Sequence, residues 1–272
     1  MLTVDRRIFM RSVQRFILLL VVLGMCVLAT KIVSAKAVGI WLFDEGKGDT
    51  VKEAQGYKHD GEFVGGVKWE KAGRFGSAVR FDGKTGHIEI PDPDHTLAPK
   101  HLTLMAWVKV DNVSGTKSIM EQYDWLPDLG IHAFRINGTT IEWYAIWAQC
   151  QPCREAKGGK IKEKQWTHVV GTYDGKASRL YQDGKFVIES KPGPNSDLLP
   201  SNKSLSIGVR GDTKDVHWMA GVIDEAAIFD TALSLKEIQT IFKSPNGLKG
   251  AVLAVGSPQS KLAVTWGQLK GQ

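Results

Sequence analysis

The sequence predicts an all-β sandwich or barrel of short antiparallel strands with one short helix. Asp-Gly and Asn-Gly dipeptides supply the positive φ that two-residue hairpin turns require. They recur along the chain, beginning at Asp60, Asp82, Asn137, Asp174, Asp183 and Asn246. The runs between them are short and rich in β-branched and aromatic residues. Such runs, at a spacing of roughly ten residues, indicate antiparallel sheets rather than βαβ units.

Alternation of side chains supports particular strands. Residues 102–110 divide between two faces, with Leu102, Leu104, Ala106 and Val108 on one and Met105 and Trp107 on the other. Residues 166–173 alternate in the same way. Residues 179–182 and 185–189 flank Asp183-Gly184 and form the clearest predicted hairpin. Each of these segments has the period of two that a half-buried strand requires.

The predicted helix begins near residue 234. Ser234-Leu235-Lys236-Glu237 is a capping box, and Leu233 and Ile238 fall at the two positions of a hydrophobic staple. The helix is expected to end near Lys243, because a Pro and an Asn-Gly pair follow. In the tail, residues 245–272, we expect a terminal β-hairpin with strands at 251–255 and 262–266.

The positive charge of the chain is concentrated near the N-terminus. Residues 1–35 contain five basic side chains and one acidic one, a net charge of +4 out of the +6 of the whole chain. Residues 36–272 are therefore close to neutral, which excludes a nucleic-acid partner for them.

The same N-terminal residues predict an export signal. Four arginines precede the uncharged run 16–30, whose 15 residues span about 22 Å as a helix, short of the roughly 30 Å of a bilayer core. With Val33-Ser34-Ala35 after it, residues 1–35 read as a signal peptide cleaved before Lys36. The protein is then secreted or lies in the cell envelope. In the alternative, residues 16–30 stay as a membrane anchor, the chain's sole membrane contact.

Two cysteines lie beyond the leader, Cys150 and Cys153. Their C-x-x-C spacing occurs once, so a four-cysteine zinc site within one chain is excluded. In an exported protein we expect a disulfide bond between them that constrains a loop.

Five stretches taken in order resemble a known family. They are residues 39–46, 73–91, 102–108, 166–184 and 222–234. The most specific is Trp166-Thr-His-Val-Val-Gly-Thr-Tyr-Asp-Gly175. The chain resembles the laminin-G-like jelly-roll domains of the concanavalin A-like lectin/glucanase superfamily, in their bacterial secreted form. The resemblance implies a two-sheet antiparallel jelly roll over residues 36–244 and leaves 245–272 outside it.

The resemblance also implies a calcium site. Relatives often hold a structural Ca²⁺ near their first and last strands, and the matching positions here are Asp44 and Asp224, with Glu45, Asp60 and Glu225 nearby. In the alternative, the two aspartates cap turns by accepting backbone hydrogen bonds.

Catalytic patterns are missing from the sequence. The glucanases of the superfamily place three acids as E-x-D-x-x-E on one strand. The nearest approach, Glu121 with Asp124, has the wrong spacing, and neither G-x-S-x-G nor H-E-x-x-H occurs. We therefore expect a protein that is not an enzyme, and we expect His168 to be a structural residue of a core strand.

Aromatic residues outside the core are the candidates for ligand binding. Trp41, Trp107 and Trp166 lie in the matched strands and are expected to pack. The candidates are Tyr123, Trp125, Trp143, Trp147 and Trp218. Such rings stack on the apolar C–H faces of sugars; in the alternative, they pack the loops onto the sandwich.

These observations predict an exported, non-catalytic module that recognises carbohydrate or an extracellular matrix polymer. A structural or adhesive cell-envelope protein with a cell-surface protein partner is the first alternative. A glycan hydrolase or lyase of the same superfamily is the second.

Overall fold

The computed structural model describes residues 35–122, 131–146, 154–191, 197–198, 201 and 203–253. One set of strands comprises β1 (Ala37–Trp41), β4 (Val67–Glu70), β5 (Ala78–Asp82), β7 (Leu102–Val110), β12 (Thr167–Tyr173), β13 (Ser178–Gln182), β14 (Lys185–Glu189) and β16 (Ala220–Phe229). The other comprises β2 (Thr50–Val51), β3 (Gly61–Val64), β6 (His87–Ile90), β8 (Thr116–Gln122), β9 (Ile131–Asn137), β10 (Thr140–Ile146), β11 (Arg154–Gly158) and β15 (Leu205–Ile207). The helical elements described are α2 (Leu235–Phe242) and a π-helical turn, Lys249–Leu253.

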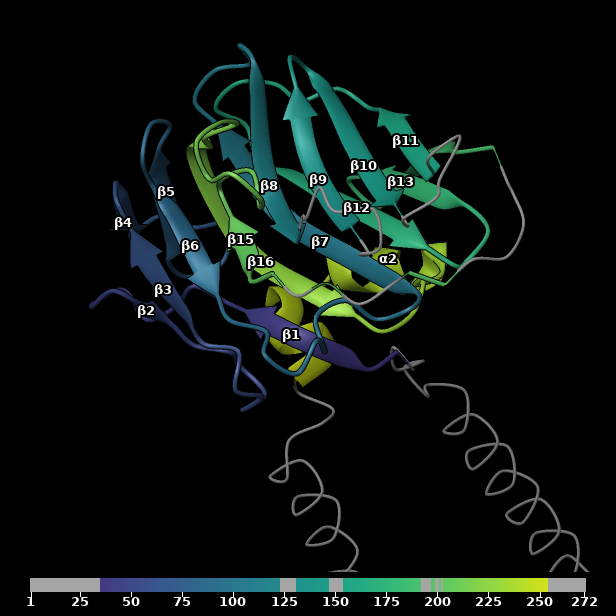
Figure 1. Cartoon of the computed structure of the whole chain (residues 1–272), viewed down its shortest axis with the longest axis horizontal. Coiled ribbons are helices and arrows are strands. Elements are labelled where there is room, and N and C mark those ends of the chain that lie inside the picture. The colour runs from purple at the N-terminus through teal and green to yellow at the C-terminus, as the bar shows by residue number, and fades with distance from the viewer. Residues whose placement is uncertain are drawn as a thin grey trace, which may run out of the picture. The chain divides into compact units, whose positions relative to one another are not determined.

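These strands form two antiparallel sheets that face each other (Figure 1). In the described residues each sheet has eight strands. Sheet A has the order β14-β13-β12-β7-β16-β5-β4, with β1 paired to β16, and sheet B has the order β11-β10-β9-β8-β15-β6-β3-β2. The sequence prediction of an all-β, two-sheet jelly roll with one short α-helix is confirmed.

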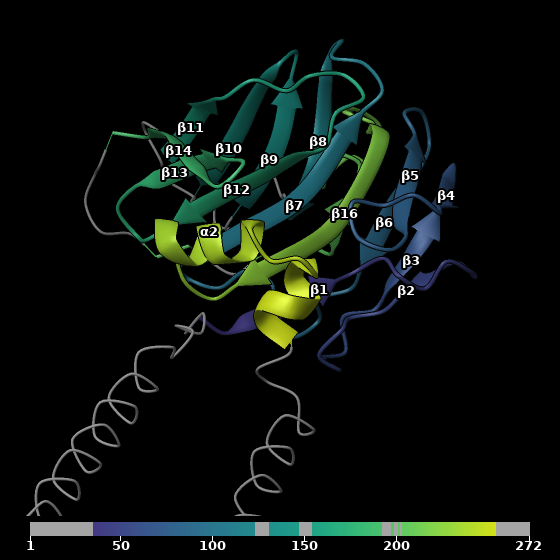
Figure 2. The ribbon, with the colours of Figure 1, turned by 180° about the vertical axis from the view of Figure 1, so that it is seen from behind.

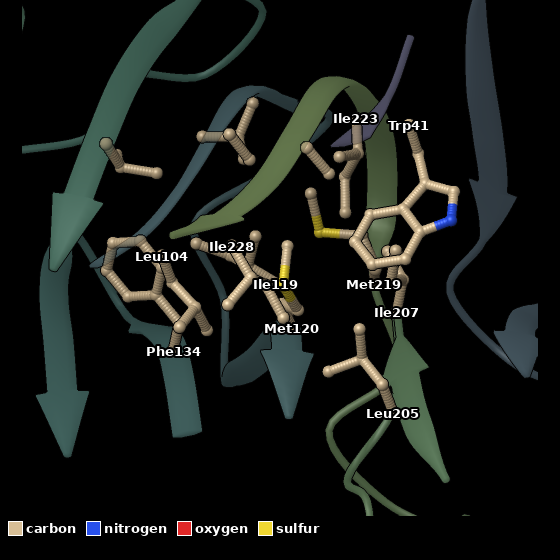
Figure 3. Packing of buried hydrophobic residues seen from close by; sticks show 14 of the residues in the cluster. Trp41, Leu104, Ile119, Met120, Phe134, Leu205, Ile207, Met219, Ile223 and Ile228 are labelled. Carbon is tan, nitrogen blue, oxygen red and sulfur yellow. The ribbon is translucent and has the colours of Figure 1, made fainter. Parts of the chain in front are cut away.

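The main core lies between the two sheets (Figure 3). Leu104, Ile223 and Ile228 come from sheet A. They meet Met120, Phe134, Leu205 and Ile207 of sheet B, and all seven side chains are fully buried. The predicted alternation of residues 102–110 is confirmed, because the four residues assigned to one face all belong to this core.

A second apolar cluster covers the outer face of sheet A. Ile238 and Ile241 of α2 pack there against Met105, Val170 and Phe229. Seen from behind, α2 lies in front of β7 and β12 (Figure 2). Because both of its faces are covered, every residue of β12 is buried.

The local signals for α2 act as predicted. The Glu237 amide donates to Ser234 Oγ at 3.3 Å, and the Ser234 amide donates to Glu237 Oε2 at 2.8 Å, which completes the capping box. Leu233 and Ile238 are both buried in the second cluster. In the predicted hairpin, Asp183 and Gly184 have φ values of 50° and 71°, as a two-residue turn requires.

The predicted terminal hairpin is wrong where the structure describes it. Residues 251–253 belong to the π-helical turn, and Ala251 and Val252 pack against the second cluster together with Leu248. The outer face of sheet A therefore contacts these apolar residues, which follow the predicted end of the jelly roll at residue 244. Residues 254–272 lie outside the described part of the chain.

The described residues all belong to the compact unit Val33–Gln272. Within them, no helix combines the length and apolar character that crossing a bilayer demands. The predicted signal peptide or anchor, residues 1–35, lies outside the described ranges except for its last residue.

Candidate functional site

The outer face of sheet B carries a row of polar side chains across six strands. Alternation along each strand directs the side chains of Ile88, Ile207, Met120, Phe134 and Trp143 into the core. The side chains of their neighbours in the chain point outward. Cross-strand register then aligns Glu89, Ser206, Glu121, Ala133, Tyr144 and Glu155 in successive pairs. A neighbouring row pairs Ser118, Arg135, Glu142 and Lys157. We call these two rows the polar face.

An ion pair anchors the centre of the polar face. Arg135 Nε and Nη2 donate to the two carboxylate oxygens of Glu121 at 2.6 and 2.7 Å. Glu121 is fully buried and also accepts from the Ser118 hydroxyl and, at 3.4 Å, from the Gly211 amide. Arg135 is thereby held in place, and Glu121 is closed to any ligand.

Tyr144 is held beside that pair. Its hydroxyl donates to Glu142 Oε2 at 2.8 Å. Burial and this hydrogen bond raise the pKa of Tyr144 to about 12, so the phenol stays neutral. Arg135 Cζ and Lys157 Nζ lie 5.6 and 5.2 Å from the ring centroid, within reach of a cation–π interaction. The half-buried ring therefore has a fixed orientation.

Trp218 lies at the β6 side of sheet B. Its ring centroid is 6.0 Å from that of His87, and its indole N–H donates to the Asp215 carbonyl at 3.1 Å. Beside it, Glu89 accepts from Lys214. Burial opposes ionisation of Glu89, but hydrogen bonds from His87 and Lys214 outweigh it and lower the pKa of Glu89 to about 2. Trp218, predicted as a ligand residue, thus lies half-buried among fixed polar groups.

Trp143 corrects the sequence prediction. Its side chain is 0% exposed and packs edge-on against Phe134, with ring centroids 5.7 Å apart. The indole N–H donates to the Thr172 carbonyl at 3.0 Å. Strand alternation places Trp143 inward and Tyr144 outward, so Trp143 is a core residue and is not available to bind a ligand.

The other predicted aromatics, Tyr123, Trp125 and Trp147, lie outside the described residues, as do Cys150 and Cys153. The strands that flank them, β8 and β10, run in the same direction because β9 pairs antiparallel with both. The C-terminal ends of β8 and β10, at Gln122 and Ile146, therefore lie at the same end of sheet B.

Sequence reasoning missed Arg135 and Glu142, and of the neighbouring rings Trp143 and Tyr144 it selected Trp143 as the ligand residue. The signal was present, since polar residues alternate with apolar ones in residues 134–137 and again in 140–144. Trp41 and Trp107, by contrast, are buried as predicted. His168 is also buried, and burial lowers its pKa to about 3, in keeping with a structural role.

Three carboxyl groups gather where sheet A meets the C-terminal segment. Asp224 Oδ2 accepts from the Arg74 and Phe75 amides at 2.7 and 2.9 Å, and Asp44 Oδ1 accepts from the Ser77 amide at 3.1 Å. Glu225 Oε2 accepts from the Leu248 amide at 2.5 Å. These bonds are what the turn-capping alternative expects.

The turn-capping alternative leaves one atom unexplained. Asp224 Oδ1 is buried and has no hydrogen-bond partner in the described structure. Burial raises the pKa of Asp224 to about 7 and that of Glu225 to about 8, and the charge of Asp44 adds to both shifts. Extra positive charge would relieve this repulsion, so the donor chemistry fits a hard cation such as Ca²⁺.

Other observations weigh against a metal here. Asp44 and Glu225 line a cavity of about 570 Å³ together with Lys249, whose ammonium group competes with a cation. Across the described ranges, no three His, Cys, Asp or Glu side chains are grouped as metal ligands. Asp60 is engaged elsewhere, with Lys52 Nζ at 2.7 Å.

Known structures share this fold. Domain 4 of AbnA, a GH43 extracellular arabinanase from Geobacillus stearothermophilus solved in complex with arabinotriose, matches with a TM-score of 0.55 and 20% identity, over 75% of this chain and 97% of that one. The binding domain of botulinum neurotoxin serotype G matches with a TM-score of 0.61 and 14% identity, over 76% of this chain and 50% of that one. The binding domain of Paraclostridial Mosquitocidal Protein 1 matches with a TM-score of 0.60 and 15% identity, over 76% of this chain and 52% of that one.

The present chain spans about half the length of the two toxin domains. A search by sequence of curated proteins finds no match. The family model for the concanavalin A-like lectin/glucanases superfamily matches residues 82–239. Because that match covers more than half of the chain, the protein belongs to the concanavalin A-like lectin/glucanase superfamily.

Proposed function

We propose that this protein is an exported, non-catalytic module that binds carbohydrate, free or in an extracellular matrix polymer, through the polar face of sheet B. One observation carries the proposal. Of the two outer faces of the sandwich, that of sheet A is covered by α2, whereas that of sheet B presents a fixed array of polar groups with Tyr144 and Trp218.

The chemistry of the polar face suits sugar hydroxyls. Arg135 and Lys157 supply donors, while Glu142 and Glu155 supply acceptors, and charges of both signs alternate along the row of Arg135, Glu142 and Lys157. The ring of Tyr144 provides a surface on which a sugar can stack. Because ion pairs already hold these side chains, binding loses little side-chain entropy. The fold-level likeness to an arabinanase domain bound to arabinotriose supports the same ligand class.

The acids of the polar face argue against glycoside hydrolysis. Glycosidases pair a protonated carboxylic acid with an ionised carboxylate. Glu121 is buried and bonded to Arg135, and Glu89, with a pKa of about 2, carries no proton near neutral pH. A non-catalytic role therefore accounts for these residues better than a hydrolase or lyase does.

A protein partner in the cell envelope is the second candidate. The observation in its favour is the edge strand β14, where Phe186 and Ile188 are 50% and 39% exposed. Edge strands with exposed apolar side chains can pair with another chain.

The test is a glycan array and pull-down on insoluble polysaccharides. We expect the unchanged chain to bind at least one glycan, and Tyr144→Ala and Trp218→Ala each to weaken binding at least tenfold. Phe186→Ala, on the far edge of sheet A, is the matched control and should bind normally. Trp125→Ala and Trp147→Ala test the predicted aromatics outside the described residues.

Two results would contradict the proposal. A blank array with a protein that co-purifies, and is lost with Phe186→Ala, would establish the envelope alternative. Release of reducing sugar from any polymer would establish an enzyme.

We further propose that a structural Ca²⁺ is held by Asp44 and Asp224. Its chemistry there would be charge neutralisation of the buried carboxyl groups of Asp224 and Glu225 and of the exposed carboxylate of Asp44. The unpartnered Asp224 Oδ1 supports this role.

A further inference from the structure

A cavity of about 450 Å³ lies between β1 and the segments that precede β3 and follow β6. Its volume falls within the range of roughly 300–1,000 Å³ that is usual for small-molecule sites. The lining residues include Lys36, Val38, Tyr57, Lys58, Asp94 and Thr96. None of these residues belongs to the polar face.

A buried carboxylate fixes the wall that carries Tyr57. Glu53 is 6% exposed, and its side chain accepts from three backbone amides, those of Ile40, Gln55 and Tyr57, at 3.0, 2.9 and 2.8 Å. These bonds tie the segment after β2 to β1. Tyr57 itself is 38% exposed, and Lys36 Nζ lies 5.6 Å from its ring centroid. The aromatic ring is thus presented on a backbone that is already ordered.

A second buried carboxylate fixes the opposite wall. Asp92 is 6% exposed and accepts from the amides of Thr96 and Leu97 at 2.9 and 3.1 Å. It also accepts from the side-chain amide of Gln122 at 2.9 Å. Both walls are therefore preorganised, which reduces the entropy lost on binding.

The buried imidazole of His59 determines what the cavity floor offers. His59 Nδ1 lies 3.4 Å from the Pro91 carbonyl oxygen. His59 Nε2 lies 2.7 Å from Thr96 Oγ1, and the Thr96 hydroxyl also lies 3.4 Å from Asp92 Oδ1, to which it can donate. In either tautomer of His59 the Thr96 oxygen keeps at least one lone pair, which can accept from a ligand hydroxyl.

The charges of the lining select an anionic ligand. The lining contains two ammonium groups, on Lys36 and Lys58, and one carboxylate, on Asp94. Val38 and the ring of Tyr57 add apolar surface of the kind that contacts the C–H face of a sugar.

We propose that this cavity binds a hexuronic acid residue, a sugar ring that bears a carboxylate. The lysines receive the carboxylate, Tyr57 stacks on the ring, and Thr96 and Asp94 accept from the hydroxyls. The inference rests on the proposed function for the choice of a carbohydrate. It adds a location apart from the polar face and a preference for acidic over neutral chains.

Titration calorimetry of the full-length chain tests this, with trigalacturonic acid as probe and neutral galactotriose as its uncharged counterpart. We expect trigalacturonic acid to bind at least tenfold more tightly, and its affinity to fall as salt rises, because salt screens exposed charges. The double variant Lys36→Ala, Lys58→Ala should bind trigalacturonic acid at least tenfold more weakly than the unchanged chain. Lys236→Ala, an exposed lysine of α2, should leave it unchanged.

The tyrosine variants separate binding from folding. Tyr57→Phe keeps the ring and should bind, whereas Tyr57→Ala should lose binding at an unchanged melting temperature. Equal affinity for the two trisaccharides would overturn the inference and leave the proposed function standing. Loss of trigalacturonate binding in Tyr144→Ala, with Tyr57→Ala unaffected, would also overturn it. Binding of no saccharide by the unchanged chain would overturn both proposals.

Discussion

Trp143 and Tyr144 are neighbours in the sequence with opposite environments in the fold. Trp143 faces the core, where a Cβ on Gly171 would lie 2.5 Å from its ring. Tyr144 faces outward between Arg135 and Lys157. The sequence clusters the two rings, but strand alternation separates them. An aromatic cluster in a strand therefore identifies a binding surface only after each residue has been assigned to a face.

At the same scale, His132 makes stability depend on pH. It is 1% exposed on the core side of β9, and burial lowers its pKa to about 4. The unfolded chain protonates this residue near pH 6.5 and the folded chain only near pH 4, so its contribution to stability is lost as the pH falls through that window. The loss is about 2.5 kcal/mol at pH 4.5.

Urea unfolding at pH 7 and at pH 4.5 measures this effect. The free energy of unfolding should fall less between pH 7 and pH 4.5 in His132→Gln than in the unchanged chain. Ile136→Val, on the same face of β9, should lower stability equally at both. An identical drop in His132→Gln and the unchanged chain would refute the assignment.

Among the elements, α2 covers the outer face of one sheet of the sandwich, sheet A. Its sequence signals predicted where it begins and ends, but not which sheet it covers. Docking on sheet A buries Ile238 and Ile241, whereas on the polar face of sheet B Arg135 and Tyr144 are half-buried and Glu155 and Lys157 are exposed. The position of the proposed glycan site is therefore a consequence of where α2 packs.

Removal of the α2 cap should weaken the whole domain. Ser234→Ala leaves the Glu237 amide without its partner, which should cost about 1 kcal/mol. Equilibrium urea unfolding measures this loss of stability, and Lys236→Ala, on the exposed face of α2, is the control. A loss in Ser234→Ala no larger than in the control would show that the capping box does not contribute.

Over the whole molecule, the carboxyl cluster joins segments that are far apart in the chain. Asp44 follows β1, Asp224 and Glu225 lie in β16, and Glu225 holds the Leu248 amide of the C-terminal segment. A cation bound there would stabilise all three segments together.

Calcium should therefore raise the melting temperature of EDTA-treated protein. At 100 times its dissociation constant, Ca²⁺ adds about 2.7 kcal/mol, which corresponds to roughly 5–10 °C for a domain of this size. Asp224→Asn should abolish the rise, and Mg²⁺ serves as the control ion. A melting temperature that is the same in Ca²⁺ and in EDTA would eliminate the calcium site.

The sequence by itself determined the strands, the hairpin at Asp183-Gly184, the α2 cap and the family resemblance. These depend on local chemistry: positive φ at a turn, alternation along a strand, and hydrogen bonds within one helical turn. Only the tertiary structure decided that Trp143 is buried, that residues 251–253 complete a helical turn on sheet A, and that Arg135, Glu142 and Tyr144 form one surface. It also decided that Lys36, Tyr57 and Thr96 share a cavity. Those outcomes depend on cross-strand register and on which apolar face covers which sheet, and both are set by contacts between residues distant in the chain.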